Sequence, residues 1–209
     1  MKQIAILGAG ESGLGAALLA KREGYGVWVS DMGQIADERK SVLTRAGIGF
    51  EEGQHSEQKI LSSDLIIKSP GIPDKAPLVK KAHEEGIPVI DELEFACRFS
   101  AGKVIAITGT NGKTTTTALV GQLCERAGKT VAVAGNIGPT LLDTLSQWLD
   151  GDAGLPQAWV LELSSFQLEG VTDFEPTVAT VLNISQDHLD WHGSMEAYVR
   201  AKSTVYGRH

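Results

Sequence analysis

Two glycine-rich turns constrain most strongly what this chain of 209 residues can fold into. Gly8–Gly13 follows the apolar run Ile4–Leu7, Thr108–Thr115 follows the apolar run Val104–Ile107, and a helical pattern comes after each turn. Short, β-branched apolar runs also alternate with helical patterns in the rest of the chain. This alternation is typical of βαβ units, so it predicts an α/β fold in which helices pack on parallel sheets.

The pattern predicts two α/β units joined near Phe99–Gly102, with domains at 1–100 and 101–209. The elements expected in the first unit are Ile4–Leu7, Ser12–Glu23, Val27–Ser30, Asp64–Ile67, Ala76–Glu85 and Val89–Ile90. Those expected in the second unit are Val104–Ile107, Lys113–Ala127, Thr130–Ala134, Thr140–Leu149, Ala158–Leu163, Thr177–Leu182 and Met195–Tyr206.

Composition and charge disfavour several classes of protein. With 19 Lys+Arg against 26 Asp+Glu, the net charge of −7 is unlike that of a general nucleic-acid binder. No stretch approaches the ~18 consecutive apolar residues of a membrane helix, and the N-terminal apolar run is too short for a secretory signal. Cys97 and Cys124 form no CxxC metal motif, so we expect reduced, partly buried thiols. We therefore expect a cytoplasmic protein without nucleic-acid or membrane partners.

The first glycine turn matches the G-x-G-x-x-G pattern of phosphate-binding loops, with Gly8, Gly10 and Gly13 at the glycine positions. Such glycines permit a tight turn and let backbone N–H groups and a helix N-terminus approach a phosphate. Asp31 ends the next expected strand, where a Rossmann acid takes ribose hydroxyls. The residues alone leave NAD and other nucleotide diphosphates open, as well as a turn that only packs helix on strand.

The second glycine turn carries the chemistry of a triphosphate-binding loop. Its segment G-x-x-G-K-T is shorter than the usual G-x-x-x-x-G-K-[ST], because Ile107 stands at the first glycine position. Clustered N–H donors, Lys113 for the β- and γ-phosphates and a Thr hydroxyl for Mg²⁺ fit this role. The alternative is a capped helix with a surface lysine. The run of threonines after Lys113 has poor helix propensity and disfavours it.

Further polar residues follow strands of the second unit, at the strand ends where open α/β sheets bind ligands. Glu162 lies in an apolar strand, where it must be paired or hold a metal unless it faces solvent from an edge strand. Asn136 can donate to a phosphate or belong to a plain turn, and Asp187 and His188 are candidate metal or phosphate contacts. By position alone, the residues expected at the surface are His55, His83, His192 and Lys202.

Together these segments resemble the Mur ligase family, which builds the peptide of peptidoglycan. The similar segments are the loop Thr108–Thr115, the GNIG turn Gly135–Gly138, the DHLD segment Asp187–Asp190 and the helical segment Tyr198–Lys202. Leu161–Glu169 (LELSSFQLE) is similar to the D-glutamate-adding members, and Gly8–Gly13 with Ser69–Ile72 resembles their uridine-nucleotide domain. The resemblance is specific because separated motifs occur in the right order over essentially the whole chain.

The resemblance implies an ATP-dependent ligase of cytoplasmic peptidoglycan precursor synthesis. ATP would phosphorylate the carboxylate of UDP-N-acetylmuramoyl-L-alanine, and the amine of D-glutamate would attack the acyl phosphate. The catalytic residues implied are Lys113, Glu162, His188 and Lys202. The residues implied for ATP are Gly109, Thr110, Asn111, Gly112, Lys113, Thr114 and Thr115. Two Mg²⁺ ions would be held by Thr114, Glu162, His188 and Lys202, the last as a carbamylated lysine.

The resemblance also implies a binding site for the UDP substrate. Its residues are Gly8, Gly10, Glu11, Ser12, Gly13, Asp31, Met32, Ser69, Pro70, Gly71, Asn136, Ser164, Gln167 and His188. Asn136 would serve the pyrophosphate, and Asp31 and Met32 the uridine. The chain departs from the family here, because members often place Thr or Ser and then a basic residue after this Asp, where Met32 and Gly33 stand.

Members of the family are considerably longer than this chain. We therefore expect an N-terminal portion with a complete uridine-nucleotide domain, a central ATP-binding domain that lacks some strands, and no C-terminal domain. Such a portion would bind ligands without turnover, and the full-length enzyme would be a monomer. The alternatives are a non-catalytic nucleotide-binding fragment and an NAD-dependent Rossmann enzyme, and the second glycine turn disfavours the latter.

Overall fold

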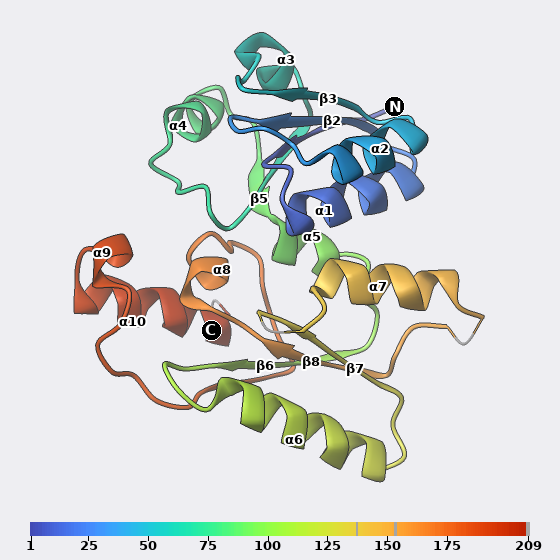
Figure 1. Cartoon of the computed structure of the whole chain (residues 1–209). Helices are drawn as coiled ribbons and strands as arrows, with labels where there is room; N and C mark the ends of the chain where they lie inside the picture. Colours follow the sequence, from blue (N-terminus) through green and yellow to red (C-terminus); the bar gives the residue numbers. More distant parts are fainter. Residues whose placement is uncertain (137, 153, 208–209) are drawn as a thin grey trace. The chain divides into compact units, whose positions relative to one another are not determined.

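The computed structural model describes residues 1–136, 138–152 and 154–207. The chain divides into two compact units, Met1–Phe95 and Ala96–His209. Each unit is built around its own parallel sheet with helices on both faces (Figure 1). The α/β class expected from the alternating pattern is therefore confirmed.

The first unit holds a five-stranded sheet in the order β3-β2-β1-β4-β5. Its strands are β1 (Gln3–Leu7), β2 (Gly26–Asp31), β3 (Gly49–Glu52), β4 (Leu65–Lys68) and β5 (Val89–Asp91), all parallel. Its helices are α1 (Glu11–Arg22), α2 (Asp37–Arg45), α3 (Glu57–Leu61) and α4 (Pro77–Glu84), and α5 (Glu92–Cys97) follows β5. The chain leaves β1 toward β2 and later adds β4 on the other side, which makes the end of β1 a topological switch point.

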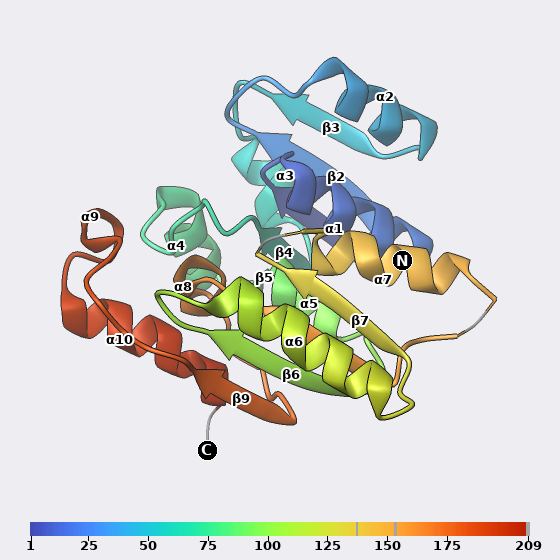
Figure 2. The same cartoon turned by 60° about the horizontal axis from the view of Figure 1, so that its bottom comes forward.

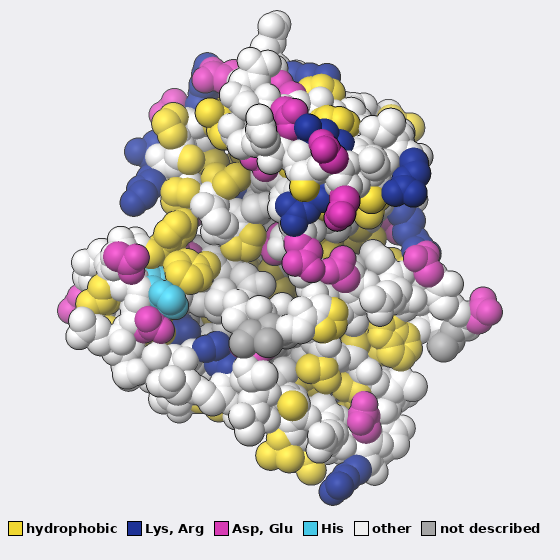
Figure 3. Space-filling view, in the orientation of Figure 1, with side chains coloured by type: hydrophobic (Ala, Val, Ile, Leu, Met, Phe, Trp, Pro, Cys, Tyr) yellow, Lys and Arg dark blue, Asp and Glu magenta, His cyan; other side chains and the backbone are white. Residues whose placement is uncertain are grey.

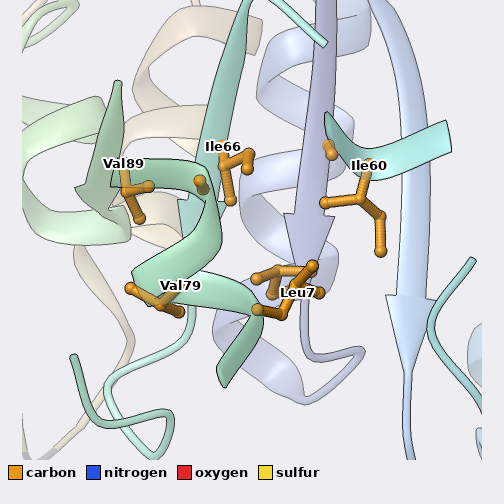
Figure 4. Close-up of a cluster of buried hydrophobic side chains, with 8 residues drawn as sticks. Leu7, Ile60, Ile66, Val79 and Val89 are labelled. Carbon is orange, nitrogen blue, oxygen red and sulfur yellow. The ribbon is translucent and has the colours of Figure 1, made fainter. Parts of the chain in front are cut away.

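The alternation of side chains along β1 builds a core on each face of this sheet. Ala5 and Leu7 face a cluster that includes Ile60 of α3 and Val79 of α4 (Figure 4). Figure 1 shows α1 and α2 on the opposite face. Because both faces are covered, β1 reads as a continuous apolar run rather than as an alternating one.

The second unit holds a four-stranded parallel sheet in the order β7-β8-β6-β9. Its strands are β6 (Lys103–Thr108), β7 (Val131–Gly135), β8 (Ala158–Glu162) and β9 (Val178–Val181). Its helices are α6 (Lys113–Arg126), α7 (Leu141–Asp150), α8 (Ser165–Glu169), α9 (Leu189–His192) and α10 (Met195–Ser203), followed by the 3-10 turn η1 (Thr204–Tyr206). Figures 1 and 2 show α6 on one face of the sheet, and α7 and α8 on the other.

Every element expected from the sequence is present, with most bounds shifted by a residue or two; the expected helix Met195–Tyr206 is α-helical only to Ser203 and continues as η1. The elements not expected from the sequence are short or polar: α2, β3, α3, α5, α8 and α9. No helix of the described ranges is both long and apolar enough to cross a membrane. Acidic and basic side chains are interspersed on the face of the molecule that Figure 3 shows.

Candidate functional site

The first glycine turn is held in place by a single carboxylate. Asp31 accepts the Ala9 N–H at Oδ2 over 2.6 Å and the Gly33 N–H at Oδ1 over 2.7 Å. Gly8 has a φ of +92°, a conformation that favours glycine. Asp31, at the end of β2, therefore links the turn after β1 to the turn after β2 by hydrogen bonds. Asp31 reaches the place expected for a Rossmann acid, with oxygen lone pairs left for a ligand.

A cavity of about 690 Å³ opens beside this turn. Six of the predicted substrate residues line it: Gly8, Gly10, Asp31, Met32, Ser69 and Gly71. Apolar side chains from the β4–α4 loop and from α4 form another part of its wall, among them Ile72, Ala76 and Val79. Within the described part of the chain, the buried Ser69 Oγ has no hydrogen-bond partner. A buried hydroxyl of this kind is costly unless a ligand or water satisfies it.

The four other predicted substrate residues of the first unit are not among the residues that line this cavity: Glu11, Ser12, Gly13 and Pro70. For Gly13 the structure provides a packing role. A Cβ atom there would collide with the carbonyl oxygen of Gly8, so only glycine lets α1 begin this close to the end of β1. The packing alternative thus accounts for the third glycine, while the first two line the cavity.

His55 is a residue of this cavity that the sequence does not reveal. We expected it at the surface, but it is half-buried, lines the cavity, and places its Nδ1 2.6 Å from Ser30 Oγ. Burial lowers its pKa below the ordinary value, although Glu51 and Asp31 oppose the shift. It was missed because it stands in a polar stretch, Glu52–Glu57, with no recognisable pattern. His83 is exposed, as expected.

The second glycine turn is fixed by the segment that follows β9. Asn183 pairs with the backbone of Asn111, accepting its N–H at 2.9 Å and donating to its carbonyl at 2.9 Å. Thr110 Oγ1 lies 3.0 Å from the hydroxyl of Tyr198 and accepts the N–H of Ser185 over 3.0 Å. Gly112 has a φ of +82° and leads directly into α6. The turn is therefore rigid before any phosphate arrives.

Lys113 is the first residue of α6, and its ammonium donates to the carbonyl of Thr110 at 3.0 Å. Thr114 and Thr115 are exposed in the same first turn. The N–H groups of a helix's first turn have no partner within the helix, and the helix dipole adds positive charge there. The turn thus combines N–H donors, an ammonium and hydroxyls, which are the groups that a triphosphate and its cation need.

Glu162 ends the inner strand β8, between β7 and β6, with only 2% of its surface exposed. The alternative of an edge-strand acid facing solvent is therefore wrong. Asn136 donates its backbone N–H to the Glu162 carbonyl at 2.8 Å, and its Nδ2 lies 3.4 Å from Oε1 of the same residue. The turn after β7 thus places polar groups against the buried Glu162 and does more than reverse the chain. Its residue Ile137 lies outside the described residues.

Lys202 is buried rather than solvated, which corrects the expectation from its position on α10. It is 2% exposed, and its Nζ donates to the Gly109 carbonyl at 3.0 Å and to Thr108 Oγ1 at 3.3 Å. Burial lowers its pKa to about 8, with a smaller contribution from the nearby positive charge of Lys113, while Asp187 opposes the shift. Much of its amine is therefore neutral near pH 8.

The segment 187–192 has two histidines in different settings. His188 has a φ of +50° and caps α9, and its Nε2 lies 3.4 Å from Asp187 Oδ2. His192 is buried and not a surface residue, with Nε2 3.0 Å from Ser165 Oγ. It was missed because a short helix, α9, turns it inward against α8 in a stretch that reads as a polar loop.

Ser164 and Gln167 use their polar groups to begin α8. Ser164 Oγ accepts the Gln167 N–H at 3.3 Å, and Gln167 Oε1 accepts the Ser164 N–H at 3.1 Å. This is a capping box, which the spacing S-x-x-Q signals in the sequence. Both residues are predicted substrate contacts, and in this structure Ser164 Oγ and Gln167 Oε1 are engaged in the cap.

A magnesium ion fits the second turn through a mixed set of groups. No cluster of three or more His, Cys, Asp or Glu residues able to hold a metal occurs in residues 1–136, 138–152 and 154–207. Mg²⁺ is commonly held by one or two protein oxygens together with waters and phosphate oxygens. The buried Glu162 carboxylate and the Thr114 hydroxyl are donors of this kind. A site completed by a nucleotide is therefore compatible with the residues present.

Each of the two α/β units thus has a glycine-rich turn that follows an inner strand of its sheet and opens a helix. The Mur ligase MurD-like N-terminal domain matches residues 2–91, and the Mur ligase middle domain matches residues 107–209. The chain therefore belongs to the Mur ligase family.

Curated relatives and solved structures agree with this assignment. The chain is 48% identical over 207 residues to UDP-N-acetylmuramoylalanine--D-glutamate ligase of Bacteroides fragilis, covering 98% of the chain and 45% of that protein. It is 49% identical over 220 residues to the ligase of the same name from Paraburkholderia phymatum, covering 99% and 43%. The chain thus spans less than half the length of these relatives.

Among solved structures, UDP-N-acetylmuramate-alanine ligase of Thermotoga maritima has a TM-score of 0.57 at 27% identity, covering 96% of this chain and 46% of that one. The UDP-N-acetylmuramate:L-alanyl-gamma-D-glutamyl-meso-diaminopimelate ligase of Neisseria meningitides has a TM-score of 0.60 at 21% identity, covering 96% and 66%. The latter likeness concerns the fold alone.

Proposed function

We propose that this chain forms the nucleotide-binding portion of an ATP-dependent ligase that joins D-glutamate to UDP-N-acetylmuramoyl-L-alanine. The observation that carries the proposal is the second turn, where Lys113, Glu162 and Lys202 come from α6, β8 and α10. The names of the curated relatives supply the substrates. The reaction is cytoplasmic, because its substrates belong to peptidoglycan precursor synthesis.

The first unit binds the UDP moiety in the cavity beside Gly8. Backbone N–H groups of the turn and the start of α1 face the pyrophosphate, Asp31 takes ribose hydroxyls, and Ser69 Oγ gains the partner that it lacks. Met32 lines the same cavity, although family members often have a hydroxyl residue at this position.

The second unit binds ATP at the turn that opens α6. Lys113 lies against the β- and γ-phosphates and lets the substrate carboxylate approach the γ-phosphorus, an encounter of two anions that charge and dipoles must stabilise. The carboxylate oxygen attacks that phosphorus and ADP departs. The amine of D-glutamate then attacks the carbonyl carbon of the acyl phosphate, which forms the amide bond and releases phosphate and a proton. Mg²⁺, when bound by Thr114 and Glu162, neutralises charge on the phosphates.

Lys202 becomes a carbamate in this proposal. Its neutral amine attacks carbon dioxide, which forms an N–C bond and releases one proton, so that a buried cation is replaced by an anion. Burial against Thr108 and Gly109 and the lowered pKa favour this reaction. The carbamate would join His188 in holding a second Mg²⁺. A carbonyl signal in ¹³C NMR with labelled bicarbonate, lost in Lys202→Ala, tests the modification.

Calorimetric titration of this chain with UDP-N-acetylmuramoyl-L-alanine, Mg·ATP and NAD tests the function. We expect the first two to bind and NAD not to bind. Tight binding of NAD without the UDP ligand would contradict the proposal. Turnover is then compared between this chain and the full-length ligase of Bacteroides fragilis. Binding with turnover confined to the longer protein would identify the chain as a binding fragment.

A further inference from the structure

The cavity beside the first glycine turn is lined by a histidine to which neither the family resemblance nor the proposed reaction gives a task. His55 lies between β3 and α3, lines the cavity, and has its Nδ1 2.6 Å from Ser30 Oγ of β2. Ser30 Oγ also lies 2.7 Å from Glu51 Oε1 and 3.3 Å from the carbonyl oxygen of Gln54. Glu51 further accepts hydrogen bonds from the backbone and side chain of Ser56.

The positions of the protons in this chain of contacts follow from the chemistry of its members. Burial raises the pKa of Glu51, but hydrogen bonds from Ser56, Ser30 and Trp28 outweigh that effect and lower it to about 2. Glu51 is therefore an ionised acceptor near neutral pH. Two oxygens 2.7 Å apart need a proton between them, so Ser30 donates its only proton to Glu51.

Because Ser30 has no second proton, its contact with His55 requires Nδ1 of the ring to be the donor. Burial lowers the pKa of His55, so the ring is neutral near pH 7.5. A neutral ring that carries its proton on Nδ1 has a bare lone pair on Nε2. The Glu51–Ser30 pair thus fixes Nε2 of His55, a residue that lines the cavity, as a hydrogen-bond acceptor.

We propose that His55 selects the base of the bound nucleotide, accepting at Nε2 a hydrogen bond from the imide N3–H of uracil. This inference rests on the proposed uridine-nucleotide site. Once attached to ribose, uracil has N3–H as its one ring N–H donor, whereas cytosine has a lone pair at N3. The apolar wall formed by Ile72, Ala76 and Val79 suits the flat face of a base, while Asp31 and the glycine turn suit ribose and phosphates.

The first experiment changes the ligand and leaves the protein intact. Calorimetry at pH 7.5 compares UDP with CDP, with N3-methyl-UDP and with 2′-deoxy-UDP. Loss of one hydrogen bond to a site built for it predicts that CDP and N3-methyl-UDP bind at least about tenfold more weakly than UDP. Equal binding of UDP and N3-methyl-UDP would overturn the role of His55 while leaving the proposed function in place. Absence of UDP binding would overturn both.

The second experiment changes the ring. In His55→Asn the amide replaces the Nδ1 end and can still reach Ser30, but the Nε2 acceptor is gone. In His55→Gln an amide oxygen can occupy the Nε2 place. We expect the preference for UDP over N3-methyl-UDP to collapse in the Asn variant and to survive partly in the Gln variant. The matched control is His83→Asn on the exposed side of α4, which should leave the preference unchanged.

The pattern across ligands decides the outcome. A similar loss of affinity for UDP and N3-methyl-UDP in His55→Asn, with the ratio between them unchanged, would assign His55 a structural role and contradict the proposal. If His55→Asn changes only the ratio of the affinities for UDP and 2′-deoxy-UDP, the contact lies at the ribose, and the proposal is again contradicted. Circular dichroism melting shows whether each variant is folded before it is titrated.

Discussion

The two glycine turns occupy equivalent places in their sheets and differ in the charge around them. Both follow a central parallel strand and open a helix, at β1–α1 and at β6–α6. The first is tied by an anion, Asp31, and adjoins a cavity with an apolar wall. The second is flanked by two lysines, Lys113 and Lys202. The same backbone arrangement thus has two different electrostatic settings.

This difference in charge agrees with the roles that the proposed function gives to the two turns. Backbone N–H groups and a helix dipole suffice to hold a diphosphate that undergoes no reaction. A phosphoryl group that reacts develops charge that side-chain cations and metal ions must meet. In the proposed function, the turn with the lysines and the buried Glu162 is the reacting end, and the turn with Asp31 is the anchoring end.

Breaking the packing of the first turn should have the largest effect. Gly13→Ala brings a Cβ into the Gly8 carbonyl, so α1 must move away from β1. We expect the first unit to lose about 3 kcal/mol of unfolding free energy, as for other forced overpacking, and to lose UDP affinity. Binding of Mg·ATP by the second unit should persist. Urea denaturation with both titrations measures this.

Gly10→Ala is the matched control for stability, because a Cβ there meets nothing within 4 Å and the φ of −65° suits alanine. A Gly13→Ala protein as stable as this control would show that the close approach is not required. Loss of both ligands together would show that the two turns depend on one another.

Removing the cation of the second turn comes next in size. Lys113→Ala deletes a charge-assisted contact to the phosphates, and we expect Mg·ATP to bind about 100-fold more weakly. UDP affinity should not change. Lys129→Ala, which removes an exposed lysine just after α6, is the control. If calorimetry gives the same ATP affinity for Lys113→Ala and Lys129→Ala, the assignment of the turn to ATP is wrong.

Weakening the anion of the first turn should have a smaller effect. Asp31→Asn retains one oxygen acceptor but loses the charge and one of the two N–H contacts from Ala9 and Gly33. We expect UDP affinity to fall about tenfold and ATP affinity to stay constant. Asp37→Asn, at a fully exposed side chain in the first turn of α2, provides the comparison. An Asp31→Asn protein with normal UDP affinity would leave Asp31 without a role in the site.

Sequence patterns predicted much of this molecule, because strong local signals coincide with its long elements. Apolar runs located strands such as β1 and β6, and glycines in constrained places located both turns. Short elements such as α3 and α9 were missed, because their few residues carry no clear periodicity and tertiary contacts decide their conformation. The S-x-x-Q spacing signals the capping box at Ser164, although the family resemblance implies substrate contacts for the same residues.

Single side chains far apart in the chain were the least predictable. The position of Lys202 on a helix indicated solvent, and only the packing of α10 against the loop at Gly109 buries its ammonium. His55 and His192 likewise depend on how polar segments fold back on the sheet and on α8. For Lys202, the local pattern predicts a solvated side chain, and only the family resemblance implies a role in the site.

The smallest expected effect is a pH dependence of the unfolding free energy of the first unit, which comes from Glu51. Burial and the stronger opposing hydrogen bonds to Glu51 leave its pKa at about 2 in the folded protein, below its ordinary 4.5. A lowered carboxyl pKa stabilises the fold fully above the unfolded value, and this contribution is lost as the pH falls from 4.5 toward 2. Because the carboxylate is partly exposed and screened, we expect it to contribute about 1 kcal/mol to the unfolding free energy.

Urea denaturation of wild type and Glu51→Gln measures this contribution at pH 7 and pH 3. The two curves should converge at the lower pH. The control Glu38→Gln, on the exposed side of α2, should follow wild type at both pH values. A Glu51→Gln protein as stable as wild type at pH 7 would contradict the charge on Glu51, and with it the proton order that makes His55 an acceptor.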